Sequence, residues 1–293
     1  MANLKEVRNR IISVTSTQQI TKAMKMVSVA KLKRATRAIS QLRPYANKMK
    51  EILANLSASL EEYNSPFMQE REAVRVLIIV IASNRGLAGA FNLNVIKTTN
   101  HLITGKYKDQ YHKGNVKIVA IGKKVQDFYE KRSYNVIGNN NELYNDLTFQ
   151  NASLITEAVM KGFANGDYDR VELVYNQFKN AAVQILIAEQ LLPVPASEKV
   201  GTANQSVDYI LEPSQEEIVE QLIPKSIKIQ VYKAILDSHA SEHGARMTAM
   251  DKATENAGDL LKALKLSYNQ ARQAAITTEL TEIVSGAAVL SKG

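Results

Sequence analysis

Residues 249–276 read AMDKATENAGDLLKALKLSYNQARQAAI, and this stretch constrains the fold of the whole chain. It belongs to a proline-free run from Lys225 to Leu290 in which alanine and leucine recur at helical spacing. The apolar stripe is too narrow to cover a globular core. At 1.5 Å per residue, a helix over this run measures about 100 Å. Such a helix needs a partner of similar length.

The first sixty residues supply that partner. Leu4, Val7, Ile11 and Val14 are separated by steps of three and four, and the stripe then turns polar before it resumes at Met24. We therefore predict a helix over residues 1–62 and another over 213–293, wound together as a long antiparallel coiled coil. Alanine at the contact would permit close approach of the two helices. The alternative, two separate helices packed on a central domain, leaves most of their length uncovered.

Two prolines and one linker modify this prediction. Pro44 is expected to bend or loosen the first helix, because it removes a backbone donor. Residues 196–212 are expected to be a polar linker. Ser214 and Glu217 have the spacing of a capping box, so a helix should begin there and be interrupted at Pro224.

The middle of the chain has a different periodicity. Short β-branched runs alternate with helical patterns, which predicts a Rossmann-like α/β domain over residues 70–195, inserted between the two long helices. The last two strands should pair as an antiparallel hairpin at the sheet edge. The expected strands are 74–81, 116–121, 171–175 and 183–191, and the expected helices are 91–103, 124–131 and 152–163.

The composition excludes several classes of protein. The 293 residues include no cysteine, so disulfide scaffolds and thiolate metal sites are impossible. The longest apolar run, Val76 to Ala82, is far shorter than the roughly 20 residues of a membrane-spanning helix. Lysine and arginine exceed aspartate and glutamate by 37 to 29, and the first 60 residues carry twelve basic side chains against two acidic ones. This distribution predicts an anionic partner: nucleic acid, acidic lipid or an acidic protein surface.

Two motifs suggest chemistry that the surrounding sequence does not support. His239, Glu242 and His243 have the H-x-x-E-H order of a zinc peptidase, but no third ligand or enclosing pocket is evident, so we expect surface or coiled-coil-seam histidines. Gly86 and Gly89 follow a strand without completing a nucleotide-loop motif, and we interpret them as a turn that allows close backbone packing. We predict no catalytic residue, cofactor site or metal site.

The two ends of the chain resemble a known family. Residues 16–32, STQQITKAMKMVSVAKL, and 272–288, RQAAITTELTEIVSGAA, are similar to the end motifs of the γ subunit of F-type ATP synthases. The segment 83–92, SNRGLAGAFN, is similar to the family's S-D-R-G-L-x-G-x-x-N, and 174–178 to its Y-N-x-F. The departures are Gln19, where lysine is usual, Asn84 in place of aspartate, and Val289 at a place normally small or basic.

The resemblance implies a central rotor stalk that couples proton or sodium translocation to ATP synthesis at sites between α and β subunits, without being an enzyme by itself. The coiled coil would enter the α/β hexamer, and the α/β domain would rest on the ε subunit and the membrane ring of c subunits. Association with the membrane would be peripheral, on the cytoplasmic side of the inner membrane, with the mitochondrial matrix side as an alternative. No nucleic-acid partner is implied.

The same resemblance assigns partner contacts to individual residues. Met24 and Lys25 would lie by the moving lever of a β subunit, and Arg246 would help the lower coil engage its neighbours. Polar contacts with β loops higher in the cavity would come from Arg272, Gln273, Thr277 and Glu279.

Two other functions remain open at this stage. A basic coiled-coil protein that binds nucleic acid or a membrane surface predicts salt-sensitive binding by the purified chain. A nucleotide-using α/β enzyme predicts turnover by the isolated chain.

Overall fold

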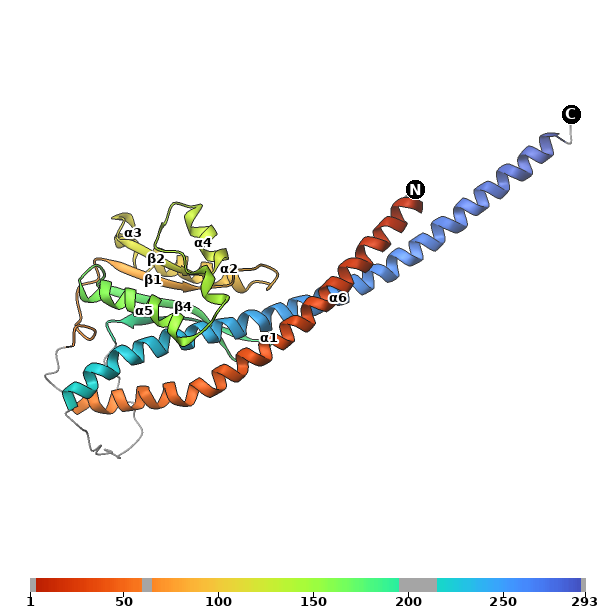
Figure 1. Ribbon diagram of the computed structural model, residues 1–293. Helices are drawn as coiled ribbons and strands as arrows, with labels where there is room; N and C mark the ends of the chain where they lie inside the picture. Colours follow the sequence, from red (N-terminus) through yellow and green to blue (C-terminus); the bar gives the residue numbers. More distant parts are fainter. Residues whose placement is uncertain (1–3, 60–64, 195–214, 291–293) are drawn as a thin grey trace. The chain divides into compact units, whose positions relative to one another are not determined.

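The computed structural model describes residues 4–59, 65–194 and 215–290 (Figure 1). Two long helices, α1 (Leu4–Ser59) and α6 (Gln215–Leu290), precede and follow an α/β domain in the sequence. The chain forms two compact units. One unit combines the two ends of the chain, up to Ser28 and from Met247, and the other runs from Val29 to Arg246. Both long helices contribute residues to both units.

A five-stranded sheet organises the unit Val29–Arg246. Its strand order is β3-β2-β1-β4-β5, with parallel pairing throughout except for the antiparallel pair β4 and β5. All six residues of β1 are buried, as expected for a central parallel strand. The strands are β1 (Val76–Ile81), β2 (Val116–Ile121), β3 (Asn135–Val136), β4 (Arg170–Phe178) and β5 (Gln184–Leu192).

Helices cover both faces of the sheet. On one face α2 (Phe91–Thr104) and α4 (Lys123–Glu130) contribute Val95, Ile103, Val125 and Tyr129 to a buried cluster. On the other face α5 (Phe149–Ala164) packs together with the first part of α6. A short helix α3 (Lys108–His112) and a 3₁₀ turn η1 (Asn141–Tyr144) complete the unit.

Within the unit Val29–Arg246, the long helices α1 and α6 run antiparallel to each other. Ala35 and Ile39 of α1 form a small apolar cluster with Leu236 and Ala240 of α6. Alanine on both helices allows them to approach closely, as the alanine spacing predicts.

The fold class is as predicted from sequence, including the hairpin of β4 and β5 at the sheet edge. The predicted interruption at Pro224 is wrong, because α6 is continuous through it. Ile223 and Ile227 on either side are 2% and 1% exposed, so packing holds the helix across the missing donor. The short elements α3, β3 and η1 were not predicted. The linker 196–212 and the cap at Ser214 lie outside the described residues.

Candidate functional site

The unit built from the chain ends has a seam of two helices. Along α1, Val7, Thr21 and Ser28 are buried, and the intervening positions at steps of three and four are half-buried. Polar groups cross the seam at its buried middle: Thr21 Oγ1 lies 2.8 Å from Thr254 Oγ1, and Gln18 Nε2 donates to the Thr254 carbonyl. These contacts are those of an antiparallel coiled coil with a polar layer.

Serine and threonine hydroxyls on these helices are largely satisfied by their own backbone. Thr15, Ser16 and Thr17 each donate to the carbonyl four residues earlier, at 2.7–3.1 Å. The same pattern recurs near the other end of the chain, at Thr277, Thr278 and Thr281. Such hydroxyls present mainly a methyl or methylene surface and have less need of an outside partner.

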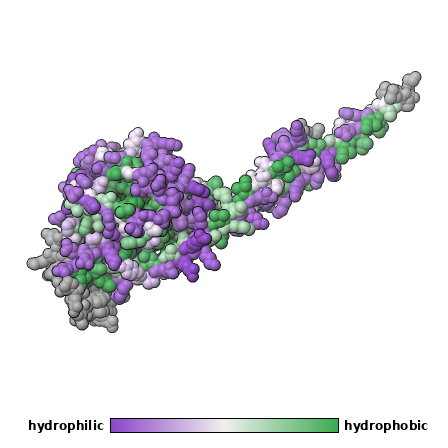
Figure 2. Space-filling view, viewed as in Figure 1, coloured by the Kyte–Doolittle hydropathy of each residue, from purple (hydrophilic) through white to green (hydrophobic). Residues whose placement is uncertain are grey.

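The last described part of α6 is exposed along its whole circumference. Every residue from Ile276 to Ala287 is exposed, although four large apolar side chains recur there at helical spacing. These four side chains are between 48% and 68% exposed. Figure 2 also shows hydrophobic residues along the last part of α6. The stripe consists of Ile276, Leu280, Ile283 and Val284.

Four predicted contact residues flank this apolar stripe, and all four are exposed. Arg272 and Glu279 are seven positions apart and therefore share one side of the helix. Gln273 and Thr277 are four positions apart and share the other side, where Thr277 Oγ1 donates to the Gln273 carbonyl at 2.9 Å. The structure thus brings these residues together around an apolar stripe that no described residue of the chain covers.

Met24 and Lys25 lie on α1, in the coiled-coil part of the same unit. Both are half-buried, and Lys25 Nζ pairs with Asp251 Oδ1 of α6. The side chains of Lys25 and Asp251 are 37% and 60% exposed, so the pair is at the surface and contributes little to stability. Its place on the rim of the seam leaves both charges accessible to another protein.

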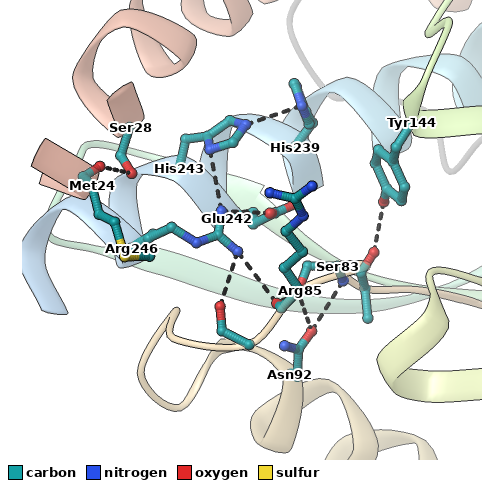
Figure 3. Close-up of polar contacts among 12 residues, drawn as sticks. Met24, Ser28, Ser83, Arg85, Asn92, Tyr144, His239, Glu242, His243 and Arg246 are labelled. Carbon is teal, nitrogen blue, oxygen red and sulfur yellow. Dashed lines mark hydrogen bonds and ion pairs between the residues drawn. The ribbon is translucent and has the colours of Figure 1, made fainter. Parts of the chain in front are cut away.

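Arg246 lies in the other unit, within a buried polar cluster (Figure 3). Its Nη1 pairs with Glu242 Oε1 at 2.6 Å and lies 3.4 Å from His243 Nδ1. Its Nη2 donates to the carbonyl oxygens of Arg85 and Gly86, each at 3.3 Å. The guanidinium is thus bound from within the chain.

The cluster continues through two histidines to the sheet. His243 Nε2 lies 3.1 Å from His239 Nε2, and the His239 ring stacks on Tyr144. Tyr144 in turn donates its hydroxyl to the carbonyl of Ala82, at the end of β1. In the loop that follows β1, the backbone N–H of Ser83 donates to Oδ1 of Asn92, which lies on α2.

Burial controls the protonation of this cluster. It lowers the pKa of His239 to about 4 and that of His243 to about 3, and the positive charges of Lys31 and Arg246 act in the same direction. Burial also raises the pKa of Glu242, although Arg246 opposes this shift. Both histidines are therefore neutral near pH 7.

The expectation of a surface position is wrong for His243, which is 4% exposed, and the His239 ring stacks on Tyr144 of the α/β domain. Among the described residues, no group of three or more metal-ligating side chains is placed to hold a metal ion. The expectation that the glycines of this turn allow close backbone packing is wrong for Gly86. Gly89 has a φ of +59°, a conformation that favours glycine. Gly86 has room for a side chain, since an added Cβ would meet only Lys124 Cε, at 3.8 Å.

The sequence identified Arg246 as a candidate residue. It did not show that Arg246 donates to the carbonyl groups of Arg85 and Gly86, or that His239 and His243 lie in a buried cluster. The resemblance in residues 83–92 was the available signal that this loop matters. No periodic pattern could show that α6 is buried on several sides here, because that burial depends on the α/β domain.

Comparison with known proteins assigns the chain to a family. The ATP synthase family model matches residues 3–290. The chain is 55% identical to the ATP synthase gamma chain of Christiangramia forsetii, over 99% of this chain and 100% of that protein. It is 54% identical to the corresponding chain of Cytophaga hutchinsonii, with the same coverage.

Solved structures share the fold. A chain in the Euglena gracilis mitochondrial ATP synthase structure of OSCP, F1 and c-ring matches with a TM-score of 0.65 and 20% identity, covering 98% of this chain and 94% of that one. A chain in the Tetrahymena thermophila central stalk and c-ring structure matches with a TM-score of 0.59 and 24% identity, covering 80% and 99%. The comparisons give no support to a nucleic-acid- or membrane-surface-binding coiled coil. No described helix is long and apolar enough to cross a membrane.

Proposed function

Because this chain belongs to the γ-chain family of ATP synthases, we propose that its paired ends turn inside a ring of α and β subunits, while its α/β domain is carried by the ε subunit and the c ring. The chain is a non-catalytic rotor subunit, and ATP is made or hydrolysed elsewhere in the complex. A shaft that presents a different face to each of three equivalent sites biases them toward different conformations.

The observation that carries this proposal is the uncovered stretch of α6 from Ile276 to Ala287. An apolar stripe on an otherwise exposed helix indicates a protein partner. Arg272 and Glu279 on one side of the stripe, and Gln273 and Thr277 on the other, supply polar contacts with loops of β subunits.

A rotating contact must be weak at every angle, because a deep energy minimum would stop rotation. The serine and threonine hydroxyls that bond to their own helix suit this requirement, since they offer few strong hydrogen bonds to a passing surface. Met24 and Lys25 would meet the moving lever of a β subunit. Arg246 would act on the neighbours of the lower coil through the loop that it holds.

We also propose the location and the coupling. Membership of the ATP synthase family supports peripheral attachment to a membrane, which we place at the cytoplasmic face of the inner membrane. Rotation would couple proton or sodium flow through the c ring to ATP synthesis.

The first experiment is capture of the tagged chain from its own cells. The expected result is co-purification of an ATPase that contains α, β and c subunits, and recovery of the chain without them would refute the proposal. In the same assemblies, Gln273→Leu and Thr277→Leu should reduce ATP synthesis severalfold without loss of helical circular dichroism.

Thr104→Leu is the matched control for Thr277→Leu. Thr104 is also exposed, on α2, and makes the same hydroxyl bond to the carbonyl four residues earlier. Synthesis should be unchanged in this variant. Equal ATP synthesis by all three variants and the wild type would show that Gln273 and Thr277 are not part of the contact surface.

A further inference from the structure

The strand order of the sheet changes direction at β1. The chain builds β2 and β3 on one side of β1, and β4 lies on its other side. In open α/β sheets, the loops after the two strands at such a point lead to opposite sides. Ligands commonly bind between these loops, beyond the carboxyl ends of the strands. Here those strands are β1 and β4.

In this protein, α6 places side chains at the edge of the sheet formed by these carboxyl ends. Arg246 donates to two carbonyl oxygens of the loop after β1, those of Arg85 and Gly86. Ser241 donates its hydroxyl to the carbonyl of Asn176, near the end of β4, at 3.1 Å. One segment of α6 is therefore hydrogen-bonded to both central strands or the loop that follows them.

Close packing against the β4–β5 turn accompanies these bonds. A Cβ added to Gly244 would lie 3.0 Å from the carbonyl oxygen and 3.2 Å from the Cα of Ala181. Both atoms belong to the backbone, so a larger residue could be accommodated only by moving the helix or the turn. Glycine at this position allows α6 to lie directly against the turn.

An ion pair between a partly exposed arginine and a buried aspartate ties α1 to the same edge. Asp237 of α6 is fully buried, and Arg43 Nη2 of α1 pairs with its Oδ1 at 3.1 Å. Arg43 Nη2 also donates to the carbonyl of Phe178, the last residue of β4, at 2.8 Å. Both long helices are thus fastened to the carboxyl end of the sheet.

We propose that residues 237–246 of α6 form a clamp across the carboxyl ends of β1 and β4, and that this clamp passes torque between the sheet and the parts of α1 and α6 that pack on it within the unit Val29–Arg246. Arg246 is a positioning residue, which holds the 83–90 loop against α6. This inference rests on the proposed rotor function, because only in a rotor does torque have to pass between the sheet and the helices.

The clamp accounts for the residue types found in residues 237–246 of α6. A cation that donates to two backbone carbonyls while paired with a buried carboxylate is bound strongly and with a fixed direction. Packing of Gly244 on Ala181 resists displacement toward β5. Together these contacts restrain rotation of α6 about its own axis relative to the sheet.

The test uses the assembled complex with Arg246→Gln, Arg246→Lys and Gly244→Val. Amide hydrogen exchange should become faster in residues 84–90 in Arg246→Gln, and in residues 180–183 in Gly244→Val. The ratio of ATP-driven ion pumping to ATP hydrolysis should fall severalfold in both variants. Arg246→Lys, which keeps the charge but offers fewer directed donors, should be intermediate.

Arg132→Gln is the matched control for the loss of an arginine. Arg132 lies two residues after the end of α4, and its Nη1 donates to the Phe128 carbonyl at the molecular surface. Exchange and pumping should match the wild type in this variant.

The outcomes separate the clamp from the rotor itself. Assembly with faster exchange and less pumping per ATP supports the clamp. Assembly with unchanged exchange, or with faster exchange but an unchanged pumping ratio, overturns it and leaves the rotor function standing. A wild-type chain that never joins the α and β subunits refutes the rotor function instead.

Discussion

At the scale of single residues, the space around backbone oxygens decides which substitutions the α/β domain tolerates. Gly122, at the end of β2, has a φ of +118°, and an added Cβ would lie 2.3 Å from the carbonyl oxygen of Ala82. Gly114 also has a positive φ, +73°, but an added Cβ there would meet nothing within 4 Å. The two glycines therefore separate backbone strain from steric clash.

We expect Gly122→Ala to lower the free energy of unfolding by at least about 3 kcal/mol, because clash and strain act together. Gly114→Ala should cost about 1 kcal/mol, from the positive φ alone. Urea unfolding of the full chain, followed by circular dichroism, measures both. Equal losses in the two variants would contradict the steric account.

The buried histidines make stability depend on pH. Because burial lowers the pKa of His239 to about 4 and of His243 to about 3, the unfolded chain binds more protons than the folded chain below the ordinary value of 6.5. Stability contributed by the neutral histidines is therefore lost as the pH falls from 6.5 toward 4. Glu242, whose pKa burial raises, acts in the opposite direction.

Replacing both histidines with glutamine removes their share of this dependence. Between pH 7 and pH 4.5, the double variant should lose less stability than the wild type, by on the order of 2 kcal/mol for each histidine. Urea unfolding at several pH values measures the difference. Parallel pH profiles for the two proteins would show that the histidines do not contribute.

At the scale of secondary-structure elements, the polar layer of the coiled coil can be tested by a double-mutant cycle. Thr21 and Thr254 share one hydrogen bond across the seam, and Thr254 also donates to its own helix, to the Met250 carbonyl at 2.7 Å. Replacing both hydroxyls by methyl groups leaves no unpaired donor between them. We expect Thr21→Val with Thr254→Val to be neutral or to raise the melting temperature.

The single variants should each be destabilised by up to about 1 kcal/mol, because the remaining hydroxyl loses its bond across the seam and keeps only the bond to a carbonyl of its own helix. Thermal unfolding of the four proteins of the cycle gives the coupling. A double variant less stable than both singles would mean that the hydroxyl pair stabilises the seam outright.

The elements differ in how far sequence alone could place them. The three- and four-residue steps from Leu4 to Val14 are a local property of the chain, so both long helices were predictable. The buried run of β1 was equally clear. By contrast, α3 and β3 are five and two residues long and carry no period. The burial of Glu242 and Arg246 depends on a loop about 160 residues earlier in the sequence, which no local pattern encodes.

At the scale of the whole molecule, the exposed end of α6 separates folding from assembly. Residues 276–287 are exposed throughout, so a chain truncated after Ala275 should keep the melting temperature of the full chain. The same truncation should weaken co-purification with α and β subunits, because the apolar stripe is lost. Differential scanning fluorimetry and capture from cells measure the two effects. A large loss of thermal stability would mean that this end contributes to the fold of the isolated chain.

The pairing of Thr21 with Thr254 joins residues 233 positions apart in the sequence. The ribosome has synthesised α1 long before it reaches the complementary stretch of α6. The strands of the sheet lie between the two in the sequence and can be completed first. During that interval the apolar stripe of the newly made α1 has no partner helix in its own chain. Synthesis of this protein therefore creates a period in which a chaperone, or a slow rate of collision between unfinished chains, must protect the helix from aggregation.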